Sequence, residues 1–368
     1  MLARTAATAL LGATCLLLAA ASAAAGPQGH RPLPAPGPER FDVEPHRGGI
    51  GLTTENTLEG FRKAMELGVT TLELDVQITE DGRAVVTHDR RVSAQKCRDT
   101  APVVPGDPEF PYVGDFITNL TLAQVRTLDC GQPLASFPSQ EVIAGVRMPL
   151  LRQALALVNC YQGDRIWLNV ETKVEAGAPQ ETAPREQFVQ VTAEEIRRAG
   201  LLERVTIQSF DWGALMRMRM VEPRLPIVAL TNGDFLQVGQ PGASPWLGGI
   251  DVDDFGGSYV RAADSFGADA LSPVHGNPQG GTVNDPDYVP YTTPELVREA
   301  HARGMAVVPW TIDDQPTMAS LIDAGVDGMI TDYPDRLREL MAERGIALPQ
   351  PVREPTGHDC LAEAHAVR

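Results

Sequence analysis

Two histidines and two carboxylates stand close together in this sequence, where their types and spacing could support acid–base and metal chemistry. His46 and His88 flank Glu73 and Asp75, and imidazoles titrate near neutral pH, as general acids and bases should. On a β-strand, Glu73 and Asp75 point to the same face. Two carboxylates on one face repel each other, and a divalent cation with oxygen ligands, Ca²⁺ or Mg²⁺, is the simplest charge that keeps both ionised. The stretch therefore predicts a metal-assisted hydrolase site.

Short apolar runs that alternate with helical segments must position these side chains. Candidate strands lie at 41–46, 71–78, 166–172, 205–210, 226–231, 269–272, 306–311 and 328–331. Helical segments are expected at 57–67, 150–159, 185–199, 212–221, 293–303, 315–324 and 334–343. This alternation predicts an α/β protein whose parallel strands close into a TIM (β/α)8 barrel. Reactive groups in such a barrel lie at the carboxyl ends of the strands, and the residues above fall there.

Two segments depart from the alternation. Residues 90–149 are rich in proline and loops, with one helix expected at 121–128, which predicts an insertion after the second strand. Residues 232–268 are rich in Gly and Asp and show poor periodicity. Capping residues mark both ends of the first predicted helix, 57–67. Asn56 is expected to be its N-cap, and Gly68 is expected to follow its last residue.

Four motifs in the first stretch carry a family resemblance. They are His46-Arg47-Gly48, Glu55-Asn56-Thr57, Glu73-Leu74-Asp75-Val76, and Asp81-Gly82 followed by Thr87-His88-Asp89. In this order and spacing they resemble the signature of the glycerophosphodiester phosphodiesterase family. Further matches at Glu171-Thr172-Lys173, Gln208-Ser209-Phe210-Asp211 and Pro309-Trp310-Thr311 extend the resemblance over residues 41–344.

The resemblance implies a role for each matching position. It implies a metal held by Glu73, Asp75 and Glu171, and an acid–base pair of His46 and His88. It also implies that Arg47 and Lys173 contact the phosphoryl oxygens and that Trp310 forms an apolar wall for the substrate. With a divalent cation these charged groups leave one net positive charge, which matches a phosphodiester monoanion.

Plainer interpretations stand beside these roles. Glu171 and Lys173 could form a structural ion pair, and Trp310 could belong to the core. His275 follows a strand and is a candidate substrate contact, whereas His301, His358 and His365 look like surface residues. Asp211 and Asp313 are strand-end residues without a role, and Asp332 could cap a helix.

The ends and the charge of the chain indicate where it works. Residues 1–25 read as a signal peptide and 26–40 as a disordered leader, followed by one domain over 41–345 and a tail over 346–368. This predicts a secreted or periplasmic protein without a stable membrane anchor. The formal net charge of −17 argues against nucleic acid or anionic membranes as partners.

Four cysteines lie outside the first 25 residues, which suggests two disulfides in an exported protein. They are Cys97, Cys130, Cys160 and Cys360. Four cysteines allow three pairings, and we favour Cys97 with Cys130 and Cys160 with Cys360, because the first two bracket one compact insertion. Free buried thiols are the alternative.

The sequence thus predicts a metal-dependent phosphodiesterase, monomeric or weakly dimeric, that converts small glycerophosphodiesters to glycerol 3-phosphate and an alcohol. Ca²⁺ is favoured over Mg²⁺, since magnesium demands tighter geometry. A phospholipase of the phosphatidylinositol-specific or sphingomyelinase D type is an alternative, although an aromatic content of 5% gives little sign of a membrane-binding rim. A non-catalytic barrel is a further alternative, but it would be expected to lack one of the two histidines.

Overall fold

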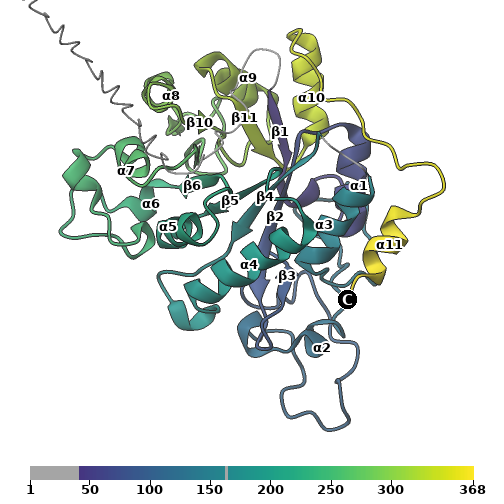
Figure 1. Ribbon diagram of the computed structural model, residues 1–368. Coiled ribbons are helices and arrows are strands. Elements are labelled where there is room, and N and C mark those ends of the chain that lie inside the picture. The colour runs from purple at the N-terminus through teal and green to yellow at the C-terminus, as the bar shows by residue number, and fades with distance from the viewer. Residues whose placement is uncertain (1–40, 162–164) are drawn as a thin grey trace, which may run out of the picture.

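A cylinder of parallel strands forms the centre of the molecule (Figure 1). The computed structural model describes residues 41–161 and 165–368, so the predicted signal peptide and leader lie outside the described residues. The barrel strands are β1 (Asp42–Pro45), β2 (Thr71–Ile78), β4 (Trp167–Thr172), β5 (Val205–Ser209), β6 (Ile227–Thr231), β7 (Ala270–Pro273), β10 (Ala306–Val307) and β11 (Gly328–Thr331). All eight predicted strands are present, with β10 shorter than expected.

Backbone hydrogen bonds join the strands into a closed ring. Strands β2, β4, β5, β6, β7 and β10 pair in parallel in that order, and β1 pairs in parallel with β11. The Ile330 amide donates to the Pro309 carbonyl over 2.9 Å beside β10, and the Thr70 amide donates to the Val43 carbonyl over 3.3 Å between β1 and β2. These bonds close the two remaining seams, which confirms the predicted TIM barrel.

Helices surround this ring (Figure 1). They are α1 (Leu58–Leu67), α3 (Leu151–Cys160), α4 (Arg185–Ala199), α5 (Trp212–Val221), α7 (Tyr259–Ser265), α8 (Pro294–His301), α9 (Gln315–Ala324) and α10 (Pro334–Glu343). The prediction missed α7 and the short helix α6 (Gly233–Leu236), because their segment lacks a helical period. Among the described residues, none of the helices combines the length and the apolar character needed to cross a bilayer.

Alternation along β2 separates the core from the site. Leu72, Leu74 and Val76 are fully buried in the main hydrophobic cluster, together with side chains of the helices such as Phe61, Phe188, Trp212 and Met341. Glu73 and Asp75 point to the opposite face, into the barrel. Burial of apolar side chains on the outer face of the strand thus fixes both carboxylates on the inner face.

One local prediction, the N-cap of α1, was wrong. Thr57 is the N-cap, and its hydroxyl accepts from the Gly60 amide over 3.0 Å. Asn56 instead adopts the left-handed conformation at φ 54°, which turns its side chain away from the helix and toward Asp75. Gly68 ends α1 at φ 97°, as expected.

The insertion after β2 is stapled and has a small core. It follows β3 (Ala84–Val86), which pairs antiparallel with β2, and it contains α2 (Leu122–Val125). Buried residues of this region form a separate cluster: Val85, Val92, Cys97, Tyr112, Ile117, Leu120, Val125, Leu128, Met148 and Leu150. The loop-rich insertion therefore has a small core of its own beside the main one. The favoured disulfide Cys97–Cys130 is present.

The second favoured disulfide, Cys160–Cys360, joins α3 to α11 (Cys360–Ala366). The Gln153 side chain of α3 also donates to the carbonyls of His365 and Val367, each over 3.1 Å. In Figure 1 the last helix lies beside α1 and α3. The C-terminal segment is thus attached to the outer helical layer.

Removing the first disulfide should destabilise the protein without altering the predicted metal site. Cys97 and Cys130 are 33 residues apart, and closing a loop of that length is worth about 3 to 4 kcal/mol by the chain-entropy estimate. We expect the Cys97→Ser/Cys130→Ser variant to melt at a lower temperature in calorimetry and to bind Ca²⁺ as the unmodified protein does. An unchanged melting temperature, or four free thiols in the oxidised protein by mass spectrometry, would contradict this expectation.

Candidate active site

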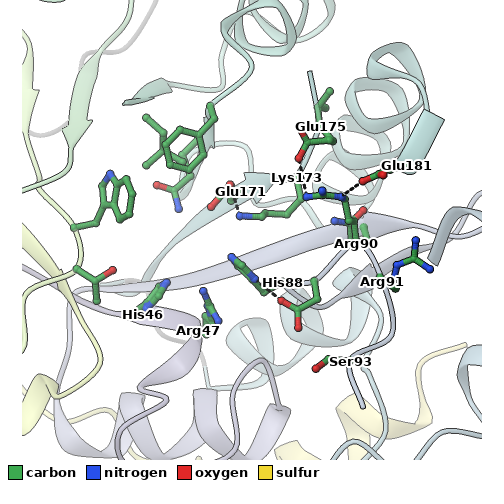
Figure 2. A pocket seen from close by; sticks show the side chains of 18 of the residues that line it. His46, Arg47, His88, Arg90, Arg91, Ser93, Glu171, Lys173, Glu175 and Glu181 are labelled. Carbon is green, nitrogen blue, oxygen red and sulfur yellow. Dashed lines mark hydrogen bonds and ion pairs between the residues drawn. The ribbon is translucent and has the colours of Figure 1, made fainter. Parts of the chain in front are cut away.

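A cavity of about 910 Å³ opens at the carboxyl ends of the barrel strands. Its lining includes seven of the eight predicted site residues, namely His46, Arg47, Glu73, His88, Glu171, Lys173 and Trp310. Figure 2 shows His46, Arg47, His88, Glu171 and Lys173 gathered around one space, although they come from separate elements. The eighth residue, Asp75, lies at the base of this group and is fully buried.

A tight turn at the end of β1 sets the entrance to the site. Arg47 adopts the left-handed conformation at φ 54°, and its amide donates to Glu73 Oε2 over 2.7 Å. Gly48 follows at φ 83°, and a Cβ added there would approach the Phe61 ring to 2.9 Å. This close approach explains why glycine follows the His–Arg pair. The hydrogen bond from the Arg47 amide connects the end of β1 to the Glu73 carboxylate of β2.

Three buried carboxylates converge, and two of them, Glu73 and Glu171, line the cavity. Ligand oxygens of Glu73, Asp75 and Glu171 lie within 4.8 Å of one another. Burial, and then the charge of Asp75, raise the pKa of Glu73 well above its usual value. Burial also raises the pKa of Glu171 to about 7, against the opposing influence of Lys173. Positive charge from the protein alone is therefore too little to hold the pKa values of Glu73 and Glu171 in their usual range.

The donor set fits a divalent cation. Asp75 Oδ2 accepts from the Asn56 amide group over 2.9 Å, whereas Asp75 Oδ1 is buried and has no hydrogen-bond partner among the described residues. Glu73 accepts from the Gln208 side chain over 2.9 Å, which orients the carboxylate. Three carboxylates, one of them with an oxygen that accepts no hydrogen bond from the described residues, are the ligands that Ca²⁺ and Mg²⁺ prefer.

Two cations of the protein stand beside these carboxylates. Lys173 Nζ lies 2.8 Å from Glu171 and 3.7 Å from Asp75, and Arg47 Nε lies 3.6 Å from Asp75. Burial alone would raise the pKa of Asp75, but His88, Lys173 and Arg47 together lower it below its usual range. Glu171 and Lys173 thus form the ion pair that was the plainer alternative, but both residues also line the cavity.

Each histidine has a carboxylate partner at Nδ1. His46 Nδ1 lies 2.6 Å from Asp332, and His88 Nδ1 lies 2.8 Å from Asp89. This contact fixes the orientation of each ring and leaves Nε2 as the nitrogen that can exchange a proton with a ligand. Burial lowers the pKa of His88, and the nearby cations Lys173 and Arg47 lower it further.

Sequence reasoning missed the role of Asp332. This residue was expected to cap a helix, but the N-cap of α10 is Tyr333, without a side-chain cap, and Asp332 contacts His46 instead. Asp313 supports this contact by accepting from the Asp332 amide over 2.9 Å. The sequence did hold a signal for this contact. Asp332 directly follows the last strand, β11, and a closed barrel places the end of β11 beside the end of β1, where His46 lies.

An aromatic wall lines the opposite side of the cavity. Trp310 is held by a hydrogen bond from Nε1 to the Ser272 carbonyl over 2.9 Å, and its ring meets Phe210 edge to face at 5.3 Å. Phe235 also meets Phe210 edge to face and stacks on Trp246 at 4.2 Å. Phe235 and Trp246 come from the weakly periodic segment 232–268, so the sequence did not single them out.

The remaining candidates take structural positions. His275 is buried, with Nδ1 2.9 Å from the Tyr288 hydroxyl and Nε2 2.8 Å from the Gln279 carbonyl, and it does not line the cavity. Asp211 caps α5 and pairs with Arg185 over 2.8 Å. Three histidines predicted to lie on the surface are exposed, as expected: His301, His358 and His365.

Comparison with known proteins shows to which family the chain belongs. Residues 46–336 match the model of the Glycerophosphoryl diester phosphodiesterase family. A glycerophosphodiester phosphodiesterase of Caldanaerobacter subterraneus is 29% identical over 82% of this chain and 97% of its own length.

Solved structures show the same architecture. A Silicibacter pomeroyi protein, described as a candidate glycerophosphoryl diester phosphodiesterase, is 29% identical, with a TM-score of 0.69 over 85% of this chain and 97% of its own. An Oleispira antarctica phosphodiesterase, solved with the product sn-glycerol-3-phosphate, is 19% identical, with a TM-score of 0.57 over 82% of this chain and 96% of its own.

Proposed function

Because this chain belongs to the glycerophosphoryl diester phosphodiesterase family, we propose that it hydrolyses small glycerophosphodiesters to glycerol 3-phosphate and an alcohol. The observation that supports the proposal best is the convergence of three buried carboxylates with His46 and His88 in one cavity. The Oleispira antarctica relative was solved with sn-glycerol-3-phosphate, which fits the proposed product.

Glu73, Asp75 and Glu171 would hold the metal, with Ca²⁺ favoured over Mg²⁺. When bound, the ion would supply Lewis-acid polarisation of a phosphoryl oxygen and a fixed position for the phosphate. Asp75 Oδ1, which accepts no hydrogen bond from any residue that the structure describes, and the raised pKa values of Glu73 and Glu171 support this assignment. An added positive charge would relieve the repulsion among the three carboxylates.

The side chains of this protein would divide the remaining work. Arg47 and Lys173 would contact phosphoryl oxygens and stabilise the charge that develops on them, which is usually the largest catalytic contribution. One histidine would accept a proton from the attacking water as its oxygen bonds to phosphorus, while the other donates a proton through Nε2 to the alcohol oxygen whose bond to phosphorus breaks. Asp332 would hold the His46 ring, and Asp89 the His88 ring, in the orientation that these transfers need.

The aromatic wall would bind the organic part of the substrate. Trp310 lines the cavity and packs against Phe210, so an apolar surface faces the phosphate-binding groups. This wall lies within a cavity rather than on an exposed rim, which favours a small deacylated diester over an intact phospholipid. The presence of both histidines likewise favours an enzyme over a non-catalytic barrel.

We further propose that the protein works outside the cytoplasm, as a monomer or weak dimer without a stable membrane anchor. Two disulfides support an oxidising compartment. Mass spectrometry of the mature protein would test the signal peptide directly, since cleavage after Ala25 would leave Gly26 as the first residue.

Product analysis tests the function. We expect the purified protein, supplied with Ca²⁺, to release glycerol 3-phosphate from glycerophosphocholine and glycerophosphoethanolamine, and to leave phosphatidylinositol vesicles intact. Chelator should suppress the reaction. Release of diacylglycerol or of a phosphorylated head group from the vesicles would instead favour the phospholipase alternative, and no release from any of the substrates would overturn the proposed activity.

A further inference from the structure

One lysine of the insertion lies between two carboxylates, each of which contacts a predicted site residue. Lys96 Nζ lies 2.6 Å from Glu55 Oε1 and 2.8 Å from Asp89 Oδ2. On one side, Glu55 Oε2 accepts from Arg47 over 2.8 Å. On the other side, Asp89 Oδ1 contacts His88 Nδ1. The ammonium group thus joins the predicted phosphate-binding arginine to a predicted acid–base histidine.

Lys96 is the cation that separates the two carboxylates in this series of contacts. Glu55 and Asp89 contact the same ammonium group, so their carboxylates face each other at short range. Without a cation between them they would repel each other, and each would be free to turn away from Arg47 or His88. The side chains of Lys96 and Glu55 are only 21% and 10% exposed, so solvent would screen this repulsion incompletely.

The insertion holds Lys96 firmly from its own side. The Lys96 and Cys97 amides donate to the Ser93 carbonyl over 3.1 and 2.8 Å, and the Gln132 amide donates to the Lys96 carbonyl over 3.3 Å. Cys97 is buried and carries the disulfide to Cys130. The backbone at Lys96 is therefore attached both to the preceding turn and to the far end of the stapled loop.

We propose that Lys96 is a positioning residue of the active site, which fixes His88 through Asp89 and Arg47 through Glu55. It follows that the insertion belongs to the catalytic machinery and does more than cover the barrel. This inference rests on the proposed function for its kinetic consequences, but its structural part, the fixed orientation of His88, does not.

Kinetics of three lysine variants test the proposal. Loss of an orienting partner costs about 10- to 100-fold in activity, so Lys96→Met should lower kcat on glycerophosphocholine by that factor. Lys96→Arg keeps the charge and should retain most of the turnover. Lys63→Met is the matched control, because Lys63 of α1 also pairs with a carboxylate of the insertion, Glu141, but lies outside the cavity lining. This control should stay within about twofold of the unmodified enzyme.

A double variant shows whether the effect passes through Asp89. In an Asp89→Asn background the additional Lys96→Met change should cost much less than it does alone, because residues in one network do not contribute independently. Equal losses in both backgrounds would overturn the route through Asp89. A kcat for Lys96→Met within about twofold of the unmodified enzyme, or a loss no greater than that of Lys63→Met, would overturn the whole proposal.

A spectroscopic measurement separates this inference from the proposed function. Proton–nitrogen correlation spectra of the histidine rings report which ring nitrogen carries the proton, and a His88→Gln variant identifies the His88 signals. We expect His88 to be held in one tautomer in the unmodified protein and in Lys63→Met, and to lose this preference in Lys96→Met. Unchanged His88 signals in Lys96→Met would overturn the inference even if the enzyme hydrolyses glycerophosphodiesters. Altered signals would support it even if glycerophosphodiesters are not the substrates.

Discussion

Glu73→Gln, Asp75→Asn and Glu171→Gln are each expected to lower hydrolysis of glycerophosphocholine by about 10²-fold or more, since a single lost electrostatic contact at the reacting centre already costs 10²–10³-fold. Each change removes one charge from a set whose oxygens lie within 4.8 Å of one another. Metal affinity should fall in parallel, which calorimetric titration with Ca²⁺ measures without any turnover.

The matched control for these variants is a buried carboxylate outside the site. Glu195 of α4 pairs with Arg152 over 2.7 Å and does not line the cavity. Glu195→Gln should therefore lose stability but neither activity nor Ca²⁺ binding. Chelation of the unmodified enzyme should reproduce the loss seen in the triad variants, and added Ca²⁺ should reverse it. Full activity after exhaustive chelation, with no metal in elemental analysis, would contradict the metal site.

His46→Ala and His88→Ala should each lower turnover of glycerophosphocholine by about 10²–10⁴-fold, the usual range for general acid–base catalysis. Both rings line the same cavity and both are oriented by carboxylates. His301→Ala is the matched control, since His301 is an exposed histidine that also pairs with a carboxylate, Asp327. Near wild-type turnover by either site variant would show that the proposed acid–base pair is wrong.

The dependence of rate on pH should be bell-shaped, because one histidine must be neutral while the other is protonated. Burial, Lys173 and Arg47 lower the pKa of His88, so its neutral form persists to lower pH than that of an ordinary imidazole. We therefore expect His88 to be the proton acceptor. Activity should fall on the acid side as His88 becomes protonated, below the ordinary imidazole value of about 6.5.

A substrate with a good leaving group tests this assignment. A nitrophenyl diester needs little protonation as it departs, so it should restore much of the activity of His46→Ala and little of that of His88→Ala. Restoration of His88→Ala alone would reverse the two roles. The measurement is the ratio of kcat/KM values for the nitrophenyl diester and glycerophosphocholine in each variant.

Most of the fold and the first half of the candidate site could be predicted from the sequence, because the signals are local. The period of apolar residues fixed the eight strands, and alternation along β2 placed Glu73 and Asp75 on one face. His46 was expected at the end of the first strand, and it lies directly after β1. Each of these inferences depends on residues that are neighbours in the chain, and none of them requires knowledge of which strands pair.

Only the tertiary structure brings together the residues that orient the site. Asp332 reaches His46 because closure of the barrel sets β11 beside β1, a contact between residues 286 positions apart. Lys96 reaches Glu55 and Asp89 because the stapled insertion folds back onto the barrel. Asn56, which the sequence assigns to a helix cap, binds Asp75 instead, since a buried carboxylate without a hydrogen-bond donor is costlier than a cap that Thr57 can supply. Contacts of this kind depend on the burial and charge of distant groups, which only the folded chain defines.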